Sequence, residues 1–153
     1  MNDSRAHKES RIFSVMLNSW GWSQQGERRQ KNEDAFLNWP ERRCWAVADG
    51  VGSTAYGANA SRLLIKKLMD LPEATSLENH VRNVRSCLSE ANTLLISRAL
   101  WPGTAASTIV VLLTHEEQAA CLWSGDSRCY LMRNGVLYQC THDHTLRQEK
   151  IDN

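Results

Sequence analysis

The sequence lacks several features that would by themselves point to a function. Its five cysteines are odd in number and form no Cys-x-x-Cys pair, so neither a disulfide framework nor a zinc knuckle is indicated. The formal net charge is only +1, which gives no general reason to expect binding to nucleic acid or to an anionic membrane. No apolar run approaches membrane-spanning length, and residues 1–11 lack the apolar centre of a signal peptide. We therefore expect reduced, mostly buried thiols in a cytoplasmic protein.

What the sequence does contain is the composition of one ordinary globular domain. A chain of 153 residues, 42% hydrophobic and 23% charged, is long enough to bury a core. We expect a flexible N-terminal tail over residues 1–11 and the domain over residues 12–153. Trp20 and Trp22, which flank Gly21, are expected to be core or packing residues rather than ligand contacts.

The apolar periodicity predicts strands, then two helices, then antiparallel hairpins. The predicted strands cover residues 12–17, 35–39, 45–48, 107–114, 119–124, 129–133 and 136–140. The predicted helices cover residues 58–71 and the segment from a Thr75/Glu78 capping box to about residue 99, before a breaker at 101–103. Asn134-Gly135 is the best hairpin signal, since both residues tolerate the positive φ of a type I′ turn. This order predicts a layered α+β domain rather than a βαβ dinucleotide-binding fold.

The stretch from Trp45 to Ser53 carries the strongest chemical signal. Its apolar start, residues 45–48, is typical of a buried strand, and it stops at Asp49 followed by Gly50. A carboxylate at the mouth of a buried strand is costly unless it is hydrogen-bonded or holds a cation. Asp49 and the Gly50 carbonyl would supply two hard oxygen ligands, which suit Mg²⁺ or Mn²⁺. Asp-Gly alone is also a common turn.

Three further acids stand where predicted strands meet loops, namely Glu33, Asp34 and Asp126. The first two end a charged segment with Arg28 and Arg29, which is either a solvated loop or the lining of an anion-and-metal site. The third follows Gly125 and on its own is best explained as a turn residue that caps nearby amides. With Asp49, however, the acids make the oxygen-rich ligand set that a two-metal hydrolase needs.

Six motifs in chain order resemble the type 2C metal-dependent protein phosphatases, the PPM family, and especially its bacterial members. The match runs from about residue 14 to residue 146. The motifs are Gly26…Arg29-x-x-Asn32-Glu33-Asp34-Ala35, Val47-Ala-Asp49-Gly50-Val-Gly52, Gly57-x-x-Ala60-Ser61, Gly103-Thr104-Ala-x-Ser107-Thr108, Trp123-Ser-Gly125-Asp126-Ser127-Arg128 and Thr141-x-Asp143-His144-Thr145.

The resemblance implies a fold and a metal site. The fold would be a layered β-sandwich of antiparallel sheets flanked by helices, incomplete at the C-terminus because residues 12–153 would form only part of the family's domain. Asp49 would bridge two Mn²⁺ or Mg²⁺ ions, and Gly50 would offer its carbonyl to one of them. Glu33 and Asp34 would bind directly or through water, and Asp126 would belong to a third, weaker ion position.

The resemblance also implies a reaction. The enzyme would hydrolyse phosphoserine and phosphothreonine in proteins, by attack of a water that bridges the two ions. Arg29 would hold the substrate phosphate, for which a guanidinium is well shaped. The substrate would be a phosphoprotein, and the enzyme would oppose a bacterial serine/threonine kinase.

Two departures from the family pattern bear on activity. Val51 stands where eukaryotic members carry histidine, which fits a bacterial member. The chain ends before the segments that supply two more metal-binding aspartates in the family. We therefore expect weakened or absent activity and a tendency to self-associate through unpaired strand edges. The alternative is a non-catalytic pseudophosphatase module that binds a phosphoprotein or a regulatory partner.

Overall fold

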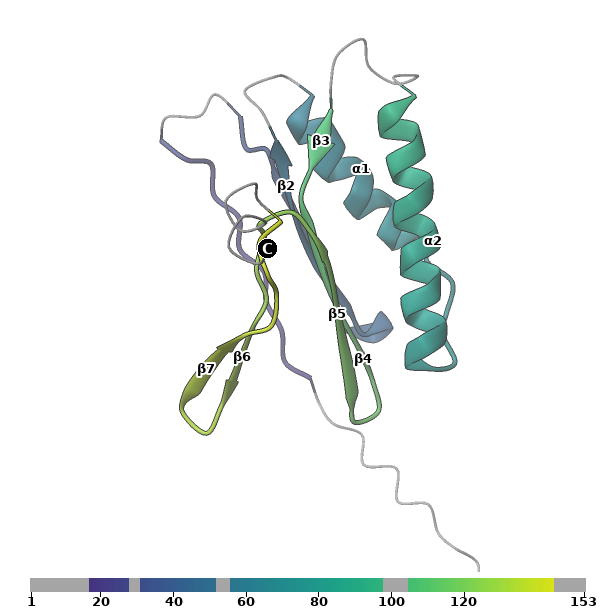
Figure 1. Ribbon diagram of the computed structural model, residues 1–153, viewed down its shortest axis with the longest axis vertical. Helices are drawn as coiled ribbons and strands as arrows, with labels where there is room; N and C mark the ends of the chain where they lie inside the picture. Colours follow the sequence, from purple (N-terminus) through teal and green to yellow (C-terminus); the bar gives the residue numbers. More distant parts are fainter. Residues whose placement is uncertain (1–16, 28–30, 52–55, 98–104, 145–153) are drawn as a thin grey trace, which may run out of the picture.

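The computed structural model describes residues 17–27, 31–51, 56–97 and 105–144 (Figure 1). Its elements in chain order are β1 (Asp34–Trp39), the 3₁₀ helix η1 (Pro40–Arg42), β2 (Cys44–Val51), α1 (Gly57–Met69), α2 (Leu77–Ile96), β3 (Ala106–Ser107), β4 (Ile109–His115), β5 (Gln118–Ser124), β6 (Tyr130–Arg133) and β7 (Val136–Gln139). The predicted order of strands, two helices and hairpins is confirmed. The predicted breaker and the tail at residues 1–11 lie outside the described residues, as does the strand over 12–17 except for Leu17, which is not in a strand.

The sheets are antiparallel, as predicted. Strands β1, β2, β4 and β5 lie side by side in that order, and β3 pairs with the end of β2. Both helices cover one face of this sheet, and the β6–β7 hairpin lies on the side of the other face (Figure 1). The layered α+β architecture is therefore confirmed. Within the described residues, the second sheet of the sandwich consists of this one hairpin.

Alternation along the central strands builds the core between sheet and helices. In β2, Cys44, Ala46 and Ala48 are buried against the helices, while the residues between them face the other way. Strand β4 adds Ile109, Val111 and Leu113 to the same layer, and α1 adds the predicted stripe of Ala60, Leu64 and Leu68 followed by Leu71. The helical stripe is buried as its spacing of four and three requires.

The second helix begins one residue later than predicted. Ser76, not Thr75, is the N-cap: its hydroxyl accepts a hydrogen bond from the backbone amide of Asn79 at 3.1 Å. The Asn79 side chain accepts in turn from the amide of Thr75 at 3.4 Å. The predicted Thr75/Glu78 box is thus replaced by a cap at Ser76, which has the extended backbone that an N-cap needs, and the returning bond from Asn79 reaches Thr75, the residue before the cap.

The expectation that Trp20 and Trp22 are core residues is wrong. Their side chains are 86% and 82% exposed. Gly21 between them lies flat against Phe36, and a Cβ on Gly21 would come within 2.2 Å of the Phe36 ring. In an extended segment, neighbours of an inward-facing residue point outward. The glycine therefore makes the contact with the sheet, and the two tryptophans project away from it.

The turn of the β6–β7 hairpin is the one that the sequence predicts. Asn134 and Gly135 have φ values of 52° and 77°, which confirms the type I′ turn.

All five cysteines are free, but the expectation that most are buried is wrong, because only Cys44 is buried and Cys140 is exposed. Cys87 lies on α2 and packs against the core, and Cys121 and Cys129 are half-buried. No helix in the described residues has the length and apolar character needed to cross a membrane.

Candidate active site

Asp49 lies inside strand β2 rather than at its end. The sequence places the strand end at Ala48, but β2 continues to Val51, because the short strand β3 pairs with Gly50 and Val51. The Asp49 side chain therefore stands on the face of the sheet turned away from the helices, where it is exposed. Its position is fixed by a ladder on both sides of the backbone rather than by a loose turn.

Asp34 stands directly opposite Asp49 in the register of β1 and β2. Two carboxylates at opposed positions repel each other unless a proton or a cation lies between them. Neighbouring groups partly desolvate the Asp49 carboxylate and so raise its pKa, and the charge and hydrogen bonding of Asp34 and the charges of Asp126 and Glu33 raise it further. The structure thus brings together all four acids that the sequence singled out.

Glu33 and Gly50 are held together by close backbone packing. The Gly50 amide donates to the Glu33 carbonyl at 3.1 Å, and the buried Ser61 hydroxyl on α1 donates to the same carbonyl at 2.6 Å. A Cβ on Gly57 would lie 3.1 Å from Glu33 Oε1 and 3.3 Å from the Gly50 carbonyl oxygen. The bare glycine therefore lets a carboxylate oxygen and a carbonyl oxygen approach one small space.

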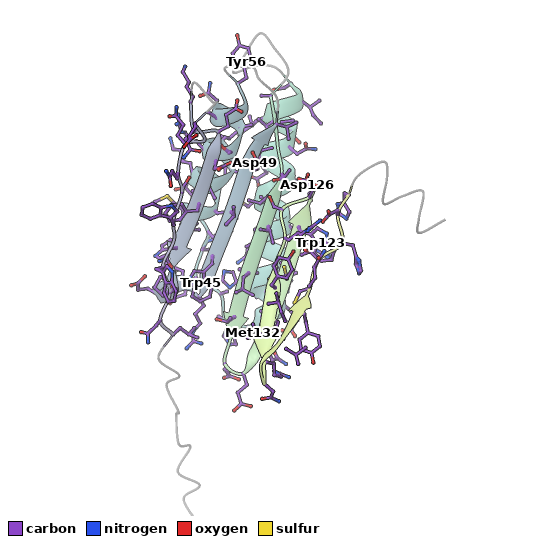
Figure 2. All side chains as sticks on the ribbon, turned by 90° about the vertical axis from the view of Figure 1, so that its left-hand side faces the viewer. Trp45, Asp49, Tyr56, Trp123, Asp126 and Met132 are labelled. Carbon is purple, nitrogen blue, oxygen red and sulfur yellow. The ribbon has the colours of Figure 1, made fainter. Side chains whose placement is uncertain are left out.

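Asp126 is tied to β2 through Thr108. The Thr108 amide donates to the Asp49 carbonyl at 2.8 Å, and the Asp49 amide donates to the Thr108 hydroxyl at 3.3 Å. That hydroxyl lies 2.6 Å from the hydroxyl of Ser127, the residue after Asp126. Gly125 has a φ of 99° and packs against Thr108 so tightly that a Cβ would come within 2.6 Å of its methyl carbon. Figure 2 shows Asp49 and Asp126 at the same end of the sheet.

A polar cavity of about 200 Å³ opens beside Asp34, Asp49 and Glu33. Its other walls include Lys31 and Asn32. The Asn32 side chain accepts from the Asp34 amide at 3.0 Å and donates to the Ser23 hydroxyl at 2.7 Å, which fixes the start of β1. Arg29, the predicted phosphate-binding residue, lies outside the described residues.

Residues of the last predicted motif form hydrogen bonds with the segment that carries Asp126. Arg128 donates two hydrogen bonds to Asp143, of 2.8 Å and 2.6 Å. The Trp123 indole donates to the His142 carbonyl at 2.8 Å and stacks on the His144 ring. The His144 amide donates to the Gly125 carbonyl at 3.0 Å. His142 and His144 thus support the loop through a backbone carbonyl, a backbone amide and a stacked ring.

Sequence reasoning missed the hydroxyls that position the acids. Ser61, Thr108 and Ser127 each bond to a group that holds Glu33, Asp49 or Asp126. All three residues belong to the motifs named from the sequence. In each of these motifs a hydroxyl residue stands near small residues, and this repeated pattern could have identified them. Lys31 was also overlooked, and its place beside the acids was hidden by the charged loop around it.

The donor set fits a hard divalent cation that keeps much of its water. The groups that raise the pKa of Asp49 are carboxylates, and carboxylate oxygens are ligands that Mg²⁺ and Mn²⁺ favour. The accumulated negative charge that raises the pKa of Asp49 is what a cation would neutralise. Within the part of the chain that the structure describes, no three His, Cys, Asp or Glu side chains converge closely enough to hold an ion alone.

The structure combines an antiparallel α+β layer with four acids gathered at one end of its sheet. Comparison with known proteins makes the assignment specific. Residues 24–149 match the family described as protein phosphatase 2C, and the chain belongs to that family.

Curated relatives include bacterial serine/threonine phosphatases. The chain is 29% identical over 136 residues to the serine/threonine phosphatase stp of Listeria monocytogenes, a match that covers 82% of this chain and 54% of that protein. It is 29% identical over 133 residues to the serine/threonine protein phosphatase PstP of Mycobacterium tuberculosis, covering 85% of this chain and 26% of that protein. The chain thus spans between about a quarter and half of these relatives.

Solved structures have the same fold. PppA, described as a key regulatory component of T6SS in Pseudomonas aeruginosa, is 40% identical with a TM-score of 0.79, over 86% of this chain and 58% of that one. The catalytic domain of PstP in complex with two manganese ions is 32% identical with a TM-score of 0.69, over 86% of this chain and 57% of that one. These neighbours confirm the fold class that the motifs implied.

Proposed function

We propose that this chain carries the metal-binding half of a serine/threonine protein phosphatase. The observation that carries the proposal is the opposition of Asp34 and Asp49 on neighbouring strands, with Glu33 and Asp126 close enough to influence the charge of Asp49. Such a concentration of carboxylates is unfavourable by itself, so a site that retains it has a use for cations. Membership of the protein phosphatase 2C family and the two manganese ions of its relative PstP support the same reading.

Each residue has a part in the proposed chemistry. Asp49 would hold two Mn²⁺ or Mg²⁺ ions, the carbonyl of Gly50 would face one of them, and Glu33 and Asp34 would bind directly or through water. When bound, such ions supply an activated water and neutralise phosphate charge. Asp126 would serve a third, weaker position, and its loop is kept in place by Thr108 and Ser127 as described above. Arg29 would orient the phosphate with its guanidinium.

The proposed substrate is a phosphoprotein bearing phosphoserine or phosphothreonine. The proposed opposing enzyme is a bacterial serine/threonine kinase in the cytoplasm. The names of the Listeria and Mycobacterium relatives support this choice of substrate class. We propose very low turnover for residues 1–153, because the described residues alone do not enclose an ion.

That last observation also favours a second candidate, a non-catalytic module that binds a phosphoprotein or a regulatory partner. The experiment that separates the two is turnover of a phosphothreonine peptide with Mn²⁺, measured beside peptide binding. Slow, Mn²⁺-dependent release of phosphate that disappears in Asp49→Asn would support the phosphatase. Peptide binding without phosphate release, unchanged in Asp49→Asn, would support the binding module and contradict the phosphatase.

A further inference from the structure

A second polar cavity lies at the opposite end of β2 from the acids. It has a volume of about 140 Å³ and is enclosed by η1, the segment between the two helices, the start of α2 and the end of β4. Figure 2 shows Trp45, next to this end of β2, far from Asp49. Cys44 lines the cavity and stands five residues before Asp49, which corresponds to about 17 Å along a strand. The two sites are therefore separate.

Two hydrogen-bonding groups in the wall of this cavity are buried without a partner. Both Nη1 of Arg42 and Oγ1 of Thr114 are inaccessible to solvent and make no hydrogen bond within the part of the chain that the structure describes. The Arg42 guanidinium also lies over the Trp39 ring, 5.3 Å from its centre, so its orientation is fixed. An unpartnered buried donor costs about 1–3 kcal/mol, and more when the group is charged. A hydrogen-bond acceptor bound in the cavity would remove this cost.

The surrounding charge has the sign that an anion requires. Arg42, Arg43, His80 and His115 line the cavity from three elements. His80 is only 3% exposed, and burial lowers its pKa, with further lowering by the charges of His115 and Arg42. Burial and these neighbours therefore hold His80 in its neutral form more strongly than an ordinary histidine.

Few acids offset these cations. Glu41 and Glu73 also line the cavity, but both are exposed. Ion pairs within the described residues join Lys67 to Glu90 and Arg128 to Asp143, so neither arginine of the cavity has a carboxylate partner there.

We propose that this cavity, the Arg42 pocket, is a binding site for a small tetrahedral oxyanion of the phosphate or sulfate type. Its volume is roughly ten times the minimum that a single water needs, so it can hold a five-atom ion. Residues of η1, β4 and α2 line the cavity, so an acceptor with oxygens on several sides can be contacted from more than one element. The bound anion would satisfy Arg42 Nη1 and Thr114 Oγ1 and favour the protonated form of His80. This assignment does not depend on the proposed phosphatase activity.

The test is a titration of the 153-residue chain with sulfate and with inorganic phosphate, followed by backbone amide NMR shifts. Chloride at matched ionic strength is the control for screening, and glycerol phosphate tests whether an esterified phosphate also enters. We expect saturable shifts at Thr114 and His80, with a Kd of about 1 mM or below. Sulfate binding should tighten as pH falls, because the pKa of His80 lies below its ordinary value and a bound anion would favour the protonated imidazole.

Matched variants decide the assignment. Arg42→Gln should weaken sulfate binding by about tenfold or more, since it removes a charge-assisted donor. Thr114→Val, which keeps the shape, should weaken it by a smaller factor and serves if Arg42→Gln does not fold. Arg62→Gln removes the same charge from an exposed site on α1 and should have no effect. Asp49→Asn should also leave it unchanged. Unsaturated shifts, or equal affinity in wild type, Arg42→Gln and Thr114→Val, would overturn the proposal.

Discussion

Asp34 and Asp49 face each other from adjacent antiparallel strands, and this opposition concentrates negative charge at one end of the sheet. Partial desolvation and the neighbouring carboxylates raise the pKa of Asp49. The repulsion between these carboxylates destabilises the fold, and it is also the reason why we propose that they bind cations. Changes at Asp49 should therefore alter stability and metal binding in opposite directions.

Replacing Asp49 with asparagine should abolish detectable Mn²⁺ binding while preserving the fold. Measured in EDTA, the variant should be more stable by about 0.2–1 kcal/mol, because one of two opposed like charges is gone. Calorimetric titration with Mn²⁺ and thermal unfolding measure the two effects. Asp70→Asn, on the exposed end of α1, is the matched control and should change neither. Unchanged Mn²⁺ binding in Asp49→Asn would refute the metal assignment.

Substitution of Arg29 should separate phosphate binding from metal binding. Arg29→Ala should weaken binding of a phosphopeptide by about 1.5–3 kcal/mol, the usual worth of a hydrogen bond to a charged group. Mn²⁺ affinity should hardly change, because an arginine does not ligate cations. Lys31→Ala, nearby in sequence and beside the acids, is the comparison. Equal losses of peptide and metal binding in Arg29→Ala would mean that Arg29 supports the loop in general.

Removing the Thr108 hydroxyl should loosen the connection between β2 and the Asp126 loop. Thr108→Val leaves the Asp49 amide and the Ser127 hydroxyl without this partner, so we expect a loss of about 1–3 kcal/mol in the free energy of unfolding. Thr108→Ser keeps the hydroxyl and should lose less. Urea denaturation followed by tryptophan fluorescence measures the difference. The positioning role fails if valine and serine variants are equally stable.

The Arg128–Asp143 pair should contribute a pH-dependent part of the stability. Hydrogen bonds from Arg128 hold the pKa of Asp143 below its ordinary value. A carboxyl whose pKa is lowered by folding stabilises the protein above its unfolded pKa of about 3.9 and loses that contribution as pH falls through the lower folded value. Acid unfolding of Asp143→Asn should therefore show a weaker dependence on pH below about 4 than the wild type. Identical acid profiles would contradict the contribution.

The chain of 153 residues should self-associate. Strands β1 and β5 are the outer strands of the larger sheet, and the hairpin exposes apolar side chains on both of its strands. Met132 and Leu137 are directly opposed and are 61% and 57% exposed. Changing both to lysine should weaken self-association by about tenfold, as judged by sedimentation. A wild-type chain that remains monomeric would count against this prediction.

The order of elements and the choice of the four acids could be made from the sequence because both depend on short-range patterns. The helical stripe through Leu64 and Leu68 and the turn at Asn134-Gly135 follow from local spacing and backbone preference. The same holds for the identity of the four acids, since each stands within a recognisable motif. These features require no knowledge of which distant segments meet.

The tertiary structure decided everything that depends on pairing between distant segments. Asp49 lies within β2 because β3, more than fifty residues later, extends the ladder, and Thr108 reaches Ser127 only through the fold. Trp20 and Trp22 resemble core residues in sequence but point outward because Gly21 takes the contact with Phe36. The Arg42 pocket is the clearest case. Its cations come from η1, α2 and β4, and no local pattern brings them together until the sheet and the helices pack.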